Sequence, residues 1–162
     1  GKGLGGRGRP LGAVSSWAMA AKAPPATADE LMAKYKSLAR DRGLEERVRN
    51  AAMLFSAAEV HLKAEEAEEA RDSAAKSLAI FRELADDTGV ADALRVLIGV
   101  HLLKEERKEG LRLATAELEA FRTRGDKRGE ASMLLCISEL TMTRFGSKKR
   151  QDALQAALEA RE

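Results

Sequence analysis

The chain has 162 residues, 44% apolar and 33% charged, and this composition favours a soluble globular protein over a disordered one. One domain with a sizeable core fits that length. Four of the 28 basic residues lie in residues 1–28, which contain no acidic residue. The remainder therefore contains 24 basic and 26 acidic residues. That near balance argues against a nucleic-acid-binding groove formed by the fold itself.

Strong helix formers dominate the sequence after Pro25, and no window is both rich in β-branched residues and alternating between apolar and polar positions. We therefore expect an all-α fold without a sheet. Cys136 is the only cysteine, so no disulfide can form within the chain. The apolar runs are shorter than the roughly 20 residues that cross a bilayer, and we expect no membrane span.

Residues 1–28 are interpreted as a basic tail rich in Gly and Ala. Residues 14–23 include Trp17 and could form a short helix that Pro24 and Pro25 would stop. The shortage of acids weakly resembles the end of an organellar transit peptide, and a flexible tail is the plainer alternative. The expected location is intracellular and soluble, either cytoplasmic or in a plastid or mitochondrion.

A first helix is predicted from Asp29 to Gly43. Thr27 or Asp29 can cap its first turn, and Glu30 is an acid where the helix dipole favours one. Leu31 and Tyr35 are four residues apart and therefore share one apolar face.

From this point the chain repeats every 40 residues without a gap. The matches include three leucines (Leu54, Leu94, Leu134), three further leucines (Leu78, Leu118, Leu158), Phe81 with Phe121, Asp86 with Asp126, and Gly89 with Gly129. Such a period is typical of a helical array. We predict a repeat domain over residues 29–162, with repeats at about 47–86, 87–126 and 127–162.

Each period contains two helical patterns. First helices are expected at 45–62, 90–103 and 129–144, and second helices at 66–84, 106–123 and 148–161. The links between them are short, so neighbouring helices should run antiparallel. The turn-forming residues from Asp86 to Gly89 are expected to lie outside any helix.

The segment from Ala93 to Leu102, followed by a charged turn and Gly110, resembles a tetratricopeptide repeat, and in particular the longer variants found in kinesin light chains. In that family, large apolar residues of a first helix interlock with a small residue of the second helix. Leu94 and Gly110 match these positions, as do Leu54 and Ala70 in the first copy. The third copy departs from the pattern, because Arg150 occupies the small position.

The resemblance implies an α-solenoid of antiparallel helix hairpins, a right-handed superhelix of about three repeats preceded by one extra helix. It also implies a concave groove lined by the first helices, where a partner protein would bind. The groove-facing positions would be Phe55, Glu59, Lys63, Arg95, Gly99, Leu103, Glu139 and Thr143. Trp17 of the tail is a further candidate for contact with a partner. The alternative is that several of these residues belong to the core between helices.

No arrangement of residues in the sequence indicates catalysis. His61 and His101 occupy equivalent repeat positions, and we expect them to be about 10 Å or more apart, too far to share a zinc ion. Cys136 lies in an apolar run and is interpreted as a buried hydrophobic residue. We expect neither an enzyme nor a bound metal or cofactor.

The predicted function is therefore that of a non-catalytic scaffold or adaptor for protein partners, without specific nucleic-acid binding. The alternative is a structural accessory subunit of a large intracellular or organellar complex, anchored by the N-terminal tail.

Overall fold

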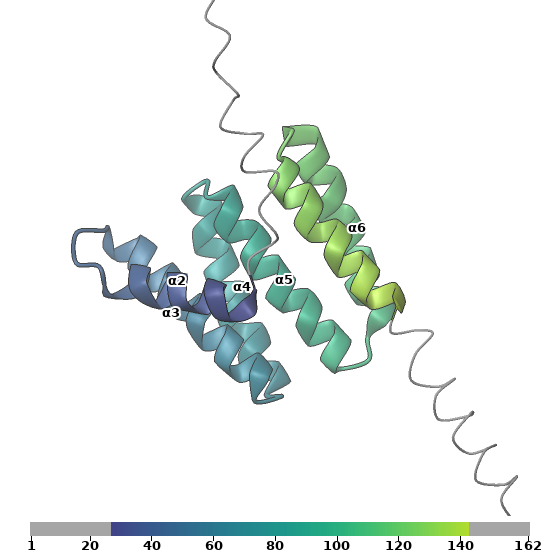
Figure 1. Ribbon diagram of the computed structural model, residues 1–162, viewed down its shortest axis with the longest axis horizontal. Helices are drawn as coiled ribbons and strands as arrows, with labels where there is room; N and C mark the ends of the chain where they lie inside the picture. The colour runs from purple at the N-terminus through teal and green to yellow at the C-terminus, as the bar shows by residue number, and fades with distance from the viewer. Residues whose placement is uncertain (1–26, 143–162) are drawn as a thin grey trace, which may run out of the picture.

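The computed structural model describes residues 27–142, and this part of the chain is helical throughout apart from short links (Figure 1). The tail before residue 27 and the predicted helix at 148–161 lie outside the described residues. The helices are α2 (Ala28–Arg40), α3 (Glu46–Lys63), α4 (Ala67–Glu83), α5 (Asp87–Leu103), α6 (Arg107–Arg124) and a further helix at 127–142. No strand occurs within residues 27–142, which agrees with the predicted all-α class.

Of the two predicted caps, Thr27 is the one that starts α2, and together with Glu30 it forms a capping box. The Thr27 hydroxyl accepts a hydrogen bond from the backbone N–H of Glu30, and the Glu30 carboxylate accepts one from the backbone N–H of Thr27 at 2.7 Å. The predicted end at Gly43 is wrong, because α2 stops at Arg40. Asp41 has an extended backbone, and its carboxylate accepts from the N–H of Gly43 at 2.8 Å, which forms a turn instead of a further helical turn.

The links after α3, α4, α5 and α6 share one backbone conformation. Each places a single residue at positive φ: Glu65, Ala85, Glu105 and Gly125. In each link the next residue donates its N–H to a carbonyl five positions earlier, at 2.8–3.0 Å, the pattern of a Schellman motif. The links therefore recur every 20 residues, twice in each 40-residue period.

The links before α5 and before residue 127 are shorter than predicted, because Asp86 and Asp126 act as caps. Their carboxylates accept hydrogen bonds from the N–H groups of Gly89 and Gly129 at 3.0 and 3.1 Å. The prediction that residues 86–89 lie outside any helix is wrong, since α5 already begins at Asp87. Gly89 and Gly129 thus belong to the first turns of helices.

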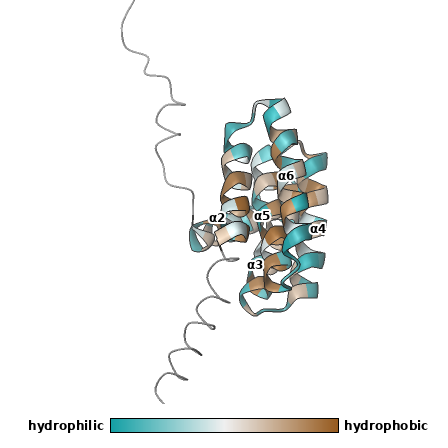
Figure 2. Cartoon of the chain, turned by 90° about the vertical axis from the view of Figure 1, so that its right-hand side faces the viewer, coloured by the Kyte–Doolittle hydropathy of each residue, from teal (hydrophilic) through white to brown (hydrophobic). Residues whose placement is uncertain are grey.

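The buried positions of α4 and α6 follow the same period. Buried residues recur 40 positions apart: Ala70 with Gly110, Ala74 with Ala114, Leu78 with Leu118, and Phe81 with Phe121. Each helix packs on the next in chain order, and α3 also contacts α5. The helices accordingly follow one another across the molecule (Figure 1), with apolar and polar residues alternating along them (Figure 2).

Candidate protein-binding surface

The predicted groove residues lie on three helices that succeed one another at intervals of one repeat. We call the seven that the structure describes the inner face: Phe55, Glu59 and Lys63 of α3, Arg95, Gly99 and Leu103 of α5, and Glu139 of the helix at 127–142. Thr143 and Trp17 lie outside the described residues. Gly99 faces Leu62 of α3, since a Cβ built on Gly99 would be 3.0 Å from a Leu62 methyl carbon.

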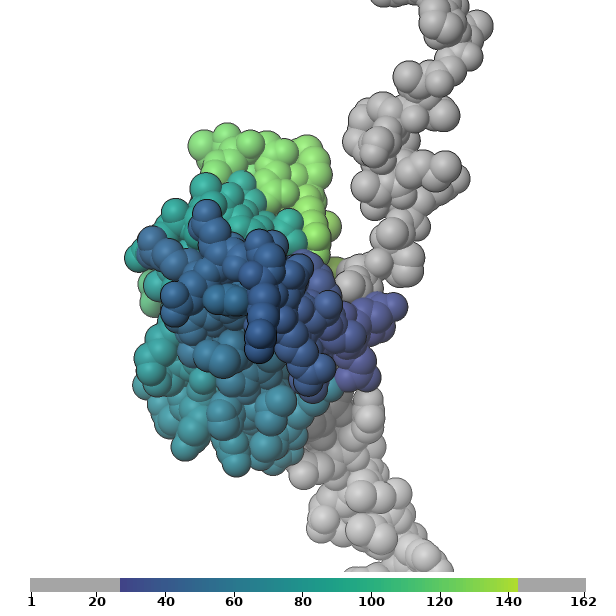
Figure 3. Space-filling view, turned by 90° about the vertical axis from the view of Figure 1, so that its left-hand side faces the viewer, coloured from purple at the N-terminus to yellow at the C-terminus, as the bar shows by residue number. Residues whose placement is uncertain are grey.

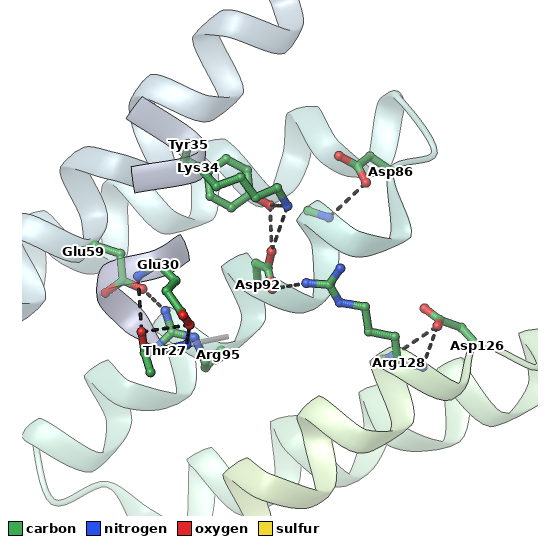
Figure 4. Close-up of polar contacts among 12 residues, drawn as sticks. Thr27, Glu30, Lys34, Tyr35, Glu59, Asp86, Asp92, Arg95, Asp126 and Arg128 are labelled. Atoms are coloured by element: carbon green, nitrogen blue, oxygen red, sulfur yellow. Dashed lines mark hydrogen bonds and ion pairs between the residues drawn. The ribbon is translucent and has the colours of Figure 1, made fainter. Parts of the chain in front are cut away.

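An ion pair joins α3 to α5 on this face. The Glu59 carboxylate is buried and contacts the guanidinium of Arg95, whose side chain is 28% exposed (Figure 4). Burial lowers the pKa of Arg95, while the charge of Glu139 acts in the opposite direction. Arg95 therefore pairs with α3, and the charge of Glu139 on the helix at 127–142 favours its protonated form.

The helix α2 covers part of the inner face. The Tyr35 ring packs on Phe55 of α3 with a centroid separation of 4.1 Å, and lies 5.7 Å from the ring of Phe81 in α4. Tyr35 and Phe55 are 1% and 0% exposed. Phe55 is thus shielded by α2, and Phe55 and Glu59, which is 1% exposed, both belong to the core, the alternative that the sequence left open.

The Tyr35 hydroxyl contacts a buried carboxylate that has partners from two helices. The Tyr35 hydroxyl donates to Asp92 of α5 at 2.8 Å. Lys34 of α2 lies 3.7 Å from the same carboxylate, and Arg128 of the helix at 127–142 lies 3.5 Å from its other oxygen (Figure 4). Asp92 therefore connects α2, α5 and the following repeat.

Burial is the largest influence on the pKa values of Asp92 and Tyr35. It raises the pKa of Asp92 above the ordinary value, against the opposing effects of the Tyr35 hydrogen bond and the charges of Arg128 and Lys34. Burial and the adjacent Asp92 charge raise the pKa of Tyr35 far above its usual range. Tyr35 therefore remains a neutral hydrogen-bond donor to Asp92 at physiological pH.

An exposed ion pair lies at the margin of the α2 contact. The Lys63 ammonium is 2.5 Å from the Asp29 carboxylate, and this hydrogen bond lowers the pKa of Asp29. Because both groups are exposed, the pair orients α2 and contributes little to stability.

The two histidines support the links between helices. His61 and His101 contact Glu66 and Glu106, each five residues later, at 2.5 and 3.0 Å. Within residues 27–142, no three His, Cys, Asp or Glu residues are grouped closely enough to hold a metal ion. Cys136 is buried, and burial raises the pKa of its thiol to about 11. None of the described helices is long and apolar enough to cross a membrane.

Sequence reasoning did not identify the cluster of Tyr35, Asp92 and Arg128. One signal was present in the sequence, because Asp92 lies between alanines in the apolar segment from Val90 to Leu94. A carboxylate in such a segment requires partners if it is buried. The sequence does not show which residues those partners are, and Tyr35 is 57 positions away.

Comparison with protein-family models, with curated proteins and with solved structures finds no match to this chain.

Proposed function

We propose that the chain is a non-catalytic adaptor that binds protein partners along the inner face of a short α-solenoid of the tetratricopeptide type. The observation that carries the proposal is the ion pair between Glu59 of α3 and Arg95 of α5, which joins two successive first helices at predicted groove positions. The recurrence of the same link every 20 residues supports a repeated helix-pair unit.

The inner face offers both apolar and charged groups to a partner. Two apolar residues on the helix that carries Glu139 are also exposed: Leu135, one repeat after Arg95, at 46%, and Met142 at 71%. Lys63 and Glu139 are both exposed and provide charges of opposite sign. A mixed surface of this kind suits a partner helix or loop better than a purely ionic ligand.

Crosslinking and mass spectrometry on the tagged full chain, captured from its native source, would test this function. Leu103→Asp should reduce the recovery of the crosslinked partner at least tenfold, because it places a charge on the inner face. The matched control is Ala116→Asp, at an exposed position of α6 outside the inner face, and it should leave recovery unchanged. Equal recovery with both variants would count against the inner face as the binding surface.

A second candidate function is that of an accessory subunit in a larger assembly. It is favoured by Met53 and Val60 of α3, which are 57% and 48% exposed and lie seven residues apart on one side of the helix. Met53→Glu together with Val60→Glu would then release the chain from the assembly in size-exclusion chromatography of a native extract. Comigration of this variant with the assembly would argue against the second candidate.

A further inference from the structure

The helix α2 does not follow the pattern of the other helices. The link from α2 to α3 comprises residues 41–45, whereas the later links comprise two or three residues. No positive φ occurs at residue 45, where the 20-residue spacing of the later links would place one. The α2 helix has 13 residues, and α3, α4, α5 and α6 each have 17 or 18. On these grounds α2 is an addition to the repeating unit.

Instead of packing only on its successor, α2 reaches across several helices. Tyr35 contacts α3 and α4 through aromatic rings and α5 through the Asp92 hydrogen bond. The carboxylate of Asp29 reaches Lys63, which is one of the inner-face residues. Figure 3 shows α2 (purple) at the surface of the molecule, where it lies along one side of the helical body.

The contact made by α2 is narrow. Only Leu31 and Tyr35 of α2 are fully buried, at 4% and 1% exposure. Part of the surface beneath them is polar, since the buried Asp92 carboxyl group accepts a hydrogen bond from Tyr35 and lies near Lys34. A helix of this length is marginal in water without tertiary contacts. The narrow contact, the polar surface and the short helix all favour the exchange of α2 for another helix.

We propose that the surface beneath α2 is a helix-binding site, that α2 occupies it as an internal ligand, and that the external ligand is an amphipathic helix which displaces α2. This inference rests on the proposed adaptor function and specifies the partner's chemistry. The contacts of α2 define that chemistry: an aliphatic residue and a tyrosine four positions apart, a base directly before the tyrosine, and an acid two positions before the aliphatic residue. They correspond to Leu31, Tyr35, Lys34 and Asp29.

The tether sets the affinity that a partner needs. A helix held by a short flexible link has an effective concentration on the order of 1 mM. If the isolated α2 segment binds with a Kd of about 10 µM, the tether weakens an external helix about 100-fold, because the site is open about 1% of the time. Release of α2 should therefore raise the apparent affinity of an external helix by at least tenfold.

The test uses the full chain and a fluorescein-labelled peptide with the sequence of residues 27–42, followed by fluorescence anisotropy. One variant, called the unlocked chain, carries Leu31→Asp and Tyr35→Asp, which together prevent α2 from occupying the site. The matched control carries Ala33→Asp and Ser37→Asp, two exposed positions of the same helix. The peptide should bind the unlocked chain at least tenfold more tightly than it binds the wild type or the control. A peptide with Leu31→Ala and Tyr35→Ala should not bind.

Hydrogen exchange on the wild-type chain provides an independent readout. The amides of α2 should exchange at least tenfold faster than those of α4, because α2 opens without unfolding the remainder. The proposal fails if the unlocked chain keeps its helical circular dichroism yet does not bind the peptide. It also fails if the unlocked chain no longer folds, or if α2 and α4 exchange at the same rate, since α2 is then an integral part of the core.

These results separate this inference from the proposed function. A chain that binds the α2 peptide but captures no partner would contradict the adaptor function and leave the helix-binding site intact. If Leu103→Asp abolishes partner capture but no variant binds the peptide, the adaptor function stands and the helix-binding site is refuted.

Discussion

Replacing Gly89 with alanine should destabilise the protein through a single contact. A Cβ on Gly89 would lie 2.4 Å from Cδ1 of Phe81 and 2.5 Å from its Cγ, where carbon atoms normally approach to about 3.5–4.0 Å. The ring would have to move by about 1 Å, yet Phe81 is only 2% exposed and packs near Tyr35. Such overpacking destabilises a protein by about 1–3 kcal/mol, whereas the higher helix propensity of alanine stabilises it by at most about 1 kcal/mol.

We therefore expect Gly89→Ala to lower the free energy of unfolding by about 1–2 kcal/mol in urea titrations followed by circular dichroism, and Tm by about 2–8 °C. Gly99→Ala is the matched control: its Cβ would meet only a flexible Leu62 methyl group at 3.0 Å, so we expect a change within about 0.5 kcal/mol. In a Phe81→Leu background, Gly89→Ala should become neutral or stabilising. The reasoning is refuted if Gly89→Ala costs nothing with Phe81 present, or costs the same after Phe81 is replaced.

Three further predictions follow from the links, from Cys136 and from Asp92. Ala85→Gly should raise the free energy of unfolding by about 0.5–1 kcal/mol, and Gly125→Ala should lower it by about 1 kcal/mol, because both positions have positive φ, which glycine adopts without strain. Urea titrations that give the opposite signs would contradict this prediction. Iodoacetamide at pH 8 should modify Cys136 about 100-fold more slowly in the folded chain than in urea. The pKa of about 11 leaves roughly 0.1% thiolate, against about 9% at the ordinary value of 9.0, and equal rates would refute the prediction. The pKa of Asp92 is raised when folded, so the folded state binds protons more readily above pH 3.8, and the stability of wild type relative to Asp92→Asn should increase as pH falls from 7 toward 4. A difference that is constant between those pH values in urea titrations would exclude this role of Asp92.

The sequence predicts much of the helical pattern because that pattern is local. Apolar spacing places the ends of α3, α4 and α6 within one residue of the observed bounds. It fails at the start of α5, where the Asp86 cap extends the helix back to Asp87. Glycine marks only one of the four positive-φ links, at Gly125, so the conformations of Glu65, Ala85 and Glu105 could not be read from residue type.

The candidate binding surface, too, could be predicted from the sequence only in part. The 40-residue period and the family resemblance identify which positions should be equivalent on successive first helices, and the structure places Glu59 and Arg95 in contact there. Neither predicts that Phe55 is covered, because the covering residue comes from outside the repeated segment.

The sequence by itself determines most of the helices and their repetition, since helical periodicity, caps and short links act over a few residues. Only the tertiary structure decides where α2 lies, and therefore which part of the inner face is covered. Its position depends on Tyr35 meeting Phe55, Phe81 and Asp92, residues 20 to 57 positions later in the chain, and such contacts form only when the helices have packed together.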